Sequence, residues 1–208
     1  MASMARIHGT VISTYTRIVQ ITCEEAQLPH ETVPTAAQCP QNRHPFGKVP
    51  LVELDGLELI ESVAITHYID NAHNSRALQP RDPAHRAVMD KWIAIANNYL
   101  FPMFENGLIM PLIMHRVMGQ PLDPEQINSA LPRISRALGF CEMELRRDKA
   151  WTANGFTLAD VFLYPVMRAL QLTPQGEVGI EQCGALLAWM QSCEERPSIK
   201  ATRWETEC

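Results

Sequence analysis

The pattern of apolar and polar positions divides the chain into two parts of different character. Up to residue 75, short apolar runs alternate with amphipathic stretches. The spacing predicts, in order, a strand over 5–8, a helix over 13–27, a strand over 30–34, a hairpin over 51–60 and a helix over 62–69. The hairpin is indicated by Asp55-Gly56, a turn dipeptide between two alternating runs. This order predicts one sheet covered by helices.

A polar stretch over 71–82, with prolines at 80 and, just after it, at 83, reads as a linker. The rest of the chain has helical spacing, and helix starts are indicated by Asp82-Pro83, Asp123-Pro124 and Thr157-Leu158. Gln126 is placed to complete a capping box. The sequence therefore predicts an α/β domain over 1–75 and an all-helical domain over 82–208.

The first helix after the linker carries two prolines within its apolar pattern. Its buried face is expected to consist of Trp92, Ala96, Tyr99 and Met103. Pro102 and Pro111 are expected to bend or break this helix, because proline lacks the N–H that an interior helical position needs.

Composition narrows the classes of function. The 208 residues are 46% hydrophobic and 20% charged, with a formal net charge of -5, and contain no block of Lys and Arg. Nucleic acid and anionic membrane are therefore poor candidates as partners. No stretch approaches the roughly 20 apolar residues of a membrane helix, and the first nine residues do not read as a signal peptide. The scattered cysteines, with no C-x-x-C pair, fit a reducing compartment, so a cytoplasmic location is expected. The six cysteines and seven histidines are dispersed, which predicts neither a disulfide framework nor a metal site.

Three segments carry candidate chemistry, and the first is Lys48-Val49-Pro50. A proline directly before a strand can hold a cis peptide bond. A cis bond here would turn the backbone of Val49 outward, where its N–H and C=O can pair with an extended peptide. The alternative is that Pro50 only begins a strand.

The second segment is Glu61-Ser62, at the expected start of a helix. Free N–H groups at a helix N-terminus attract a carboxylate, and Glu61 beside them attracts an ammonium group. One α-amino-acid head carries both charges, so this dipeptide can hold a zwitterion. The alternative is that Ser62 only caps the helix.

The third segment is Ser13-Thr14-Tyr15-Thr16, between the first strand and the first helix. A hydroxyl and N–H groups at that helix end can stabilise a thiolate and lower the pKa of its thiol. The alternative is again a helix cap. In a thioredoxin-like fold the three segments converge, and this one occupies the position where a redox protein carries C-x-x-C.

Taken together, these segments resemble glutathione transferases, and most of all the phi class. The similarity lies in 9–19, 45–50 and 61–69, and more loosely in 157–160 and 195–198. The resemblance implies a thioredoxin-like domain, an all-helical domain that contributes the substrate pocket, and a two-fold homodimer. It also implies roles for single residues: Ser13 hydrogen-bonds the glutathione sulfur, Val49 before a cis Pro50 pairs with the cysteinyl part, and Glu61 and Ser62 hold the γ-glutamyl head.

The segment between Val33 and Pro45 departs from the family, because it is shorter than in phi-class members. The basic residues that meet the glycine carboxylate there have no clear counterpart. Arg43 or His44 can substitute for them, and Lys48, which stands where phi members often have Gln, can also reach the peptide. A solvated loop is the alternative for Arg43 and His44.

The implied function is activation of the glutathione thiol by Ser13 for attack on an apolar electrophile. Met103, Met110, Met114 and Met118 with Phe101 and Phe104 are candidates for lining its site, although a plain helix core is the alternative for several of them. Addition followed by bond rotation and thiol loss would instead isomerise a conjugated double bond. A non-catalytic binding or assembly protein is a third possibility. Thiol-disulfide exchange is disfavoured, since neither Cys23 nor Cys39 lies at the position of Ser13.

Overall fold

A computed structural model describes residues 3–147 and 151–205, and its contacts group the chain into two compact units. The first comprises the chain up to Arg81 together with the segment from Glu194 onward, and the second comprises Asp82–Cys193. The break at 81/82 lies within the stretch expected to be a linker. The helical domain expected from the sequence extends to residue 208. In the structure, the segment from Glu194 onward groups with the first unit.

The first unit is built on a mixed sheet. Within the described residues it contains four strands: β1 (Ala5–Gly9), β2 (His30–Pro34), β3 (Leu51–Leu54) and β4 (Leu57–Leu59), in the order β2-β1-β3-β4. The β1–β2 pair is parallel, and the β1–β3 and β3–β4 pairs are antiparallel. These strands, like the predicted hairpin, match the positions expected from the sequence to within a residue.

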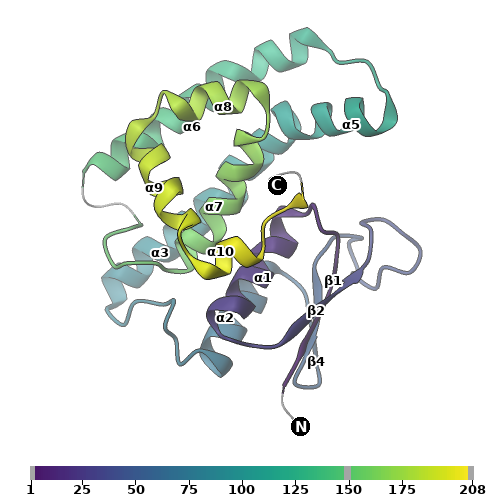
Figure 1. Cartoon of the computed structure of the whole chain (residues 1–208), viewed down its shortest axis with the longest axis vertical. Helices are drawn as coiled ribbons and strands as arrows, with labels where there is room; N and C mark the ends of the chain where they lie inside the picture. The colour runs from purple at the N-terminus through teal and green to yellow at the C-terminus, as the bar shows by residue number, and fades with distance from the viewer. Residues whose placement is uncertain (1–2, 148–150, 206–208) are drawn as a thin grey trace. The chain divides into compact units, whose positions relative to one another are not determined.

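Two helices, α1 (Thr14–Glu25) and α2 (Ser62–His73), cover one face of this sheet (Figure 1). Their apolar side chains share one core with the strands, formed by Ala5, Ile7, Val19, Cys23, Leu28, Val52, Leu54, Ile65 and Ile69. Alternation along β1 places Arg6 and His8 on the opposite face, where Arg6 pairs with Glu31 of β2. Both partners of this ion pair are about half exposed, so this face carries charged side chains.

The turns and helix starts mostly agree with the local sequence. Asp55 and Gly56 both have positive φ, as a two-residue hairpin turn requires. The start of α2 differs in one respect, since α2 begins at Ser62 and Glu61 occupies the capping position without a side-chain cap. Ser62 is therefore the first helical residue and not the cap, and α2 extends to His73, into the expected linker.

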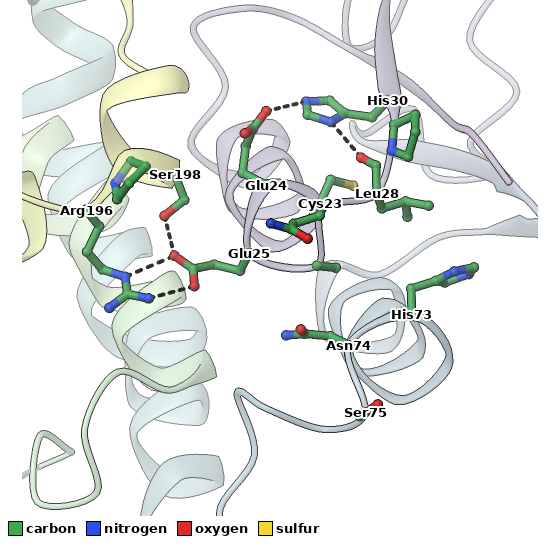
Figure 2. A pocket seen from close by; sticks show the side chains of 14 residues that line it. Cys23, Glu24, Glu25, Leu28, His30, His73, Asn74, Ser75, Arg196 and Ser198 are labelled. Carbon is green, nitrogen blue, oxygen red and sulfur yellow. Dashed lines mark hydrogen bonds and ion pairs between the residues drawn. The ribbon is translucent and has the colours of Figure 1, made fainter. Parts of the chain in front are cut away.

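The C-terminal segment returns to α1 through an ion pair. Arg196 donates two hydrogen bonds to Glu25, from Nε to Oε1 at 2.9 Å and from Nη2 to Oε2 at 2.7 Å. Ser198, in the short helix α10 (Pro197–Ala201), donates to the same carboxylate (Figure 2). Further along, the guanidinium of Arg17 lies 4.6 Å from the ring centroid of Trp204. These contacts place α10 beside α1.

The second unit begins with a helical run that its prolines modify without breaking. The run comprises α3 (Pro83–Ile95), the π-helix η1 (Ala96–Leu100), α4 (Phe101–Phe104), the π-helix η2 (Glu105–Ile109) and α5 (Met110–Met118). Each π segment ends two residues before a proline, at Leu100 before Pro102 and at Ile109 before Pro111. Its wider turns relieve the clash between the proline ring and the preceding turn.

These π turns also change which positions of the run are buried, compared with the regular helical spacing assumed from the sequence. One buried row consists of Trp92, Ala96, Leu100, Phe104 and Leu108, next to the buried Met89 and Ile93, whereas Tyr99 is 65% exposed. The expectation that Tyr99 continues the face is therefore wrong, because a wider turn shifts the register of the helix; Met103 is half-buried. Phe104, which the sequence offered for a substrate site, lies in the core.

The remaining helices of the second unit are α6 (Pro124–Arg146), α7 (Leu158–Gln171), α8 (Pro174–Glu181) and α9 (Gly184–Glu194). Asp123 caps α6, but Gln126 completes no capping box and instead donates to the carbonyl of Asn106. Along 3–147 and 151–205, no helix is both long enough and apolar enough to cross a membrane.

Candidate functional site

The register of the sheet brings the three predicted segments to one edge. His8 pairs with Leu51, so the chain that follows β1 lies beside the chain that precedes β3. Val52 pairs with Leu59, so the residues after β4 lie at this edge as well. Ser13, Val49-Pro50 and Glu61-Ser62 therefore come together from three separate parts of the sequence.

Ser13 occupies the capping position of α1. Its Oγ accepts a hydrogen bond from the N–H of Thr16 at 3.2 Å, and its carbonyl accepts from the N–H of Arg17 at 3.0 Å. Within 3–147 and 151–205, no residue accepts the proton of the Ser13 hydroxyl. The half-buried hydroxyl can thus serve as a cap through its lone pair and still donate to an incoming acceptor.

The Val49-Pro50 peptide bond is cis. Among the residues with described positions, none hydrogen-bonds to the N–H or the carbonyl of Val49. The preceding residue is held in place, because the carbonyl of Lys48 accepts a hydrogen bond from Asn42 Nδ2 at 2.9 Å. Val49 therefore presents a free donor and a free acceptor two residues before Leu51, the first residue of β3.

Glu61 and Ser62 supply a second set of free polar groups. The carboxylate of Glu61 is exposed, and the backbone of Glu61 has φ 67° and ψ 107°, in the positive-φ region that disfavours residues with a side chain. Such a conformation costs on the order of 1–3 kcal/mol and is concentrated at functional positions. The N-terminal N–H groups of α2 follow directly, so a carboxylate acceptor and N–H donors lie side by side.

The basic residues of the preceding loop have different environments. Arg43 forms ion pairs with Glu53 and with Glu58 on β3 and β4, so two carboxylates already neutralise it. His44 is buried, and its Nδ1 accepts a hydrogen bond from the N–H of Phe46 at 3.2 Å. Lys48 is exposed and forms no ion pair with a described residue. Of the three, Lys48 has the cation that is free to meet an anionic ligand.

A separate cleft of about 920 Å³ in the first unit contains none of these residues. It lies among the end of α1, the start of β2, the end of α2 and residues 196–198 (Figure 2). Several of its charged groups are paired with one another, as in Arg196 with Glu25 and His30 with Glu24. Cys23 also lines this cleft. Burial raises the pKa of its thiol to about 12, so Cys23 supplies no reactive thiolate there.

Thr16 belongs to the candidate segment picked out from the sequence, but its contact with Gly9 was not anticipated. Thr16 supplies the N–H that binds Ser13 Oγ, and its own side chain is fully buried. That side chain packs directly on Gly9, the last residue of β1. A glycine between a strand and a helix start was the available signal, but only the fold shows which side chain fills the space above it.

Comparison with protein families identifies two domains in this chain. Residues 7–77 match the family model described as "Glutathione S-transferase, N-terminal domain". Residues 102–197 match the one described as "Glutathione S-transferase, C-terminal domain". Together the two matches include the sheet edge with Ser13, Val49 and Glu61, as well as most of the helical unit.

Individual relatives support the phi-class resemblance. Glutathione S-transferase APIC of Nicotiana tabacum is 28% identical over 202 residues, which cover 93% of this chain and 94% of that protein. The structure of glutathione transferase F7 from Populus trichocarpa superposes with a TM-score of 0.84 at 23% identity, covering 95% and 97% of the two chains. Glutathione S-transferase I of maize, solved in complex with an atrazine glutathione conjugate, superposes with a TM-score of 0.84 at 25% identity over 95% of each chain.

Proposed function

Because the chain belongs to the glutathione S-transferase family, we propose that it binds glutathione and activates the thiol for attack on an electrophilic small molecule. The observation that carries the proposal is the hydrogen bonding of Ser13. Its Oγ already accepts from Thr16, so its proton is directed to another acceptor. A thiolate sulfur is such an acceptor, and it is favoured next to the N-terminus of α1.

The other groups at the sheet edge fit the rest of the tripeptide. Glu61 is placed to bind the α-ammonium of the γ-glutamyl head, while Ser62 and the free N–H groups of α2 bind its carboxylate. The free N–H and C=O of Val49 pair with the cysteinyl backbone as a short added strand. Lys48 is the cation proposed for the glycine carboxylate. Each of these assignments uses a group without a partner among the described residues.

Ser13 stabilises the charge on sulfur before attack, which lowers the pKa of the bound thiol from its ordinary value of about 8.5. In conjugation, the sulfur lone pair forms the bond to the electrophilic carbon, and the displaced group leaves with the bonding pair. The helical unit is proposed to supply the apolar surface for that electrophile. A homodimer and a cytoplasmic location remain predictions from the sequence.

Glutathione titration by calorimetry is the first test, with S-methylglutathione as a matched ligand that lacks the ionisable thiol. We expect both to bind, and we expect only glutathione to show the ultraviolet absorption of a thiolate near neutral pH. No heat with millimolar glutathione would overturn the proposal and favour a non-catalytic role.

A panel of electrophiles and conjugated polyenes, with products identified by mass, then separates the possible reactions. A product heavier by glutathione indicates conjugation, which we expect. An unchanged mass with altered double-bond geometry would indicate isomerisation. The absence of any product, despite a bound thiolate, would contradict the enzymatic proposal.

A further inference from the structure

Gly9 and Thr16 are packed so closely that only glycine fits at position 9. A Cβ added to Gly9 would lie 2.3 Å from Thr16 Oγ1, 3.0 Å from its Cγ2 and 3.2 Å from its Cβ. The φ of Gly9 is not in the positive region, so the requirement for glycine is one of space. An alanine here would therefore have to displace Thr16 or the end of β1.

Neither side of this contact can yield easily. Gly9 is the last residue of β1, paired in register with Pro34, and its carbonyl accepts the N–H of Thr35 at 3.0 Å. Thr16 has no exposed surface and is β-branched, so its χ1 has few allowed values within a helix. Rotation of χ1 exchanges Oγ1 and Cγ2 but leaves Cβ in place, so a close contact persists.

The contact bears on the proposed function because Thr16 also holds Ser13. The N–H of Thr16 donates to Ser13 Oγ at 3.2 Å; Thr16 lies in the first turn of α1 and Ser13 caps it. A displacement of Thr16 would therefore move the serine hydroxyl. We infer that the lack of a side chain at Gly9 leaves Thr16 in place and so keeps Ser13 in position for its contact with the glutathione sulfur. This inference rests on the proposed function of Ser13.

The hydroxyl of Thr16 allows a clean test, because it has no hydrogen-bond partner among the described residues. Removing it costs no hydrogen bond, and its burial against Gly9 leaves it no route to a ligand. Thr16→Ala keeps the backbone N–H that binds Ser13 and removes the two closest contacts to position 9. Thr16→Val keeps the branched shape and places a methyl group where the hydroxyl was.

The experiment is a set of four variants measured for kcat/KM with glutathione and for the apparent pKa of the bound thiol. Gly9→Ala is expected to lower kcat/KM by roughly tenfold to a hundredfold and to raise the thiol pKa, as for a misplacement near 1 Å. Thr16→Ala is expected to stay near wild type. The double variant with Gly9→Ala and Thr16→Ala should recover most of the loss, whereas Gly9→Ala with Thr16→Val should not.

A purely structural role would lower the amount of folded protein and leave the thiol pKa of the folded fraction unchanged, and that result would overturn the inference. Equal recovery with Thr16→Ala and Thr16→Val would also overturn it. Should Gly9→Ala not fold, the double variant with Gly9→Ala and Thr16→Ala provides the test, because it removes the two closest contacts to the new Cβ. Failure of Thr16→Ala to restore folding and activity would overturn the inference.

Hydrogen exchange separates this inference from the proposed function. In the protein without glutathione, the amide of Thr16 is expected to be protected in wild type and Thr16→Ala and to exchange faster in Gly9→Ala. Unchanged exchange would count against the positioning role, even if glutathione activation were established. Faster exchange of the Thr16 amide in Gly9→Ala, in a protein that neither binds nor activates glutathione, would refute the proposed function but not the effect of Gly9 on Thr16.

Discussion

Arg43 and Glu58 form an ion pair, with 2.8 Å between Nη1 of the arginine and Oε2 of the glutamate. The same guanidinium contacts Glu53, and its hydrogen bond lowers the pKa of that carboxyl. Glu53 pairs in register with Arg6, which continues the row of charges across the sheet. The loop before Val49 is therefore tied to the polar face of the sheet through its arginine.

This pairing gives the first prediction, on recognition of the glycine carboxylate. Wild type is expected to prefer glutathione over its glycyl ethyl ester, and Lys48→Gln should weaken that preference by about two- to fivefold, the range of an exposed ion pair. Arg43→Gln should leave the ratio of the two affinities unchanged, because its cation is engaged by Glu53 and Glu58. Calorimetry with both ligands measures the ratio. Loss of the preference in Arg43→Gln would reassign the contact to Arg43.

The second prediction concerns Ser13. Ser13→Ala should lower kcat on the order of a hundredfold, as expected for loss of one donor to a developing anion, with a modest effect on glutathione affinity. It also removes a helix cap, so the free energy of unfolding should fall by about 1 kcal/mol. Asp82→Ala removes the cap of α3, which accepts from the N–H of His85, and serves as the control.

Asp82→Ala should lose similar stability and keep full turnover. If the turnover of Ser13→Ala equalled that of wild type, the contact with the glutathione thiol would have to be assigned to a neighbouring residue. Thr16 is a poor replacement because its hydroxyl is buried against Gly9. Tyr15 and Thr14 would then be the residues to substitute next.

Features set by adjacent residues were readable from the sequence. The Asp55-Gly56 turn and the caps at Ser13 and Asp82 depend on local chemistry, and the structure contains all three. The segments of the candidate site could be picked out for the same reason, since each lies at a strand end or helix start.

Features set by distant partners could not be read in this way. The pairing of Arg43 depends on the register of β3 and β4, which brings Glu53 opposite Glu58. The burial of Leu100 in place of Tyr99 depends on π turns that follow from packing around two prolines. The return of the C-terminal segment to α1 depends on Glu25, 171 positions away from Arg196.

The third prediction tests that return. Arg196→Met removes both hydrogen bonds to Glu25, a carboxylate with 13% of its side chain exposed, and should lower the free energy of unfolding by about 1–2 kcal/mol. Lys200→Met removes an ion pair with Glu195, which is largely exposed, and should have an effect near zero. Denaturant unfolding measures both, and hydrogen exchange of residues 196–204 reports local loosening. Equal effects of the two variants would show that the Glu25 contact does not hold the segment.

The last prediction is a pH dependence that originates at Asp160. Burial raises the pKa of this carboxyl to about 6, although hydrogen bonds from Thr157 and from Trp189 Nε1 oppose the rise. Between about pH 4 and pH 6 the folded protein therefore binds more protons at Asp160 than the unfolded chain, so this group makes the free energy of unfolding fall as pH rises through that window. Asp160→Asn cannot titrate and should lose this contribution, while Trp189→Phe removes a hydrogen bond to the ionised form and should raise the pKa further. Carbon NMR of the Asp160 carboxyl measures the pKa directly, and a value below 4 in wild type would contradict the prediction.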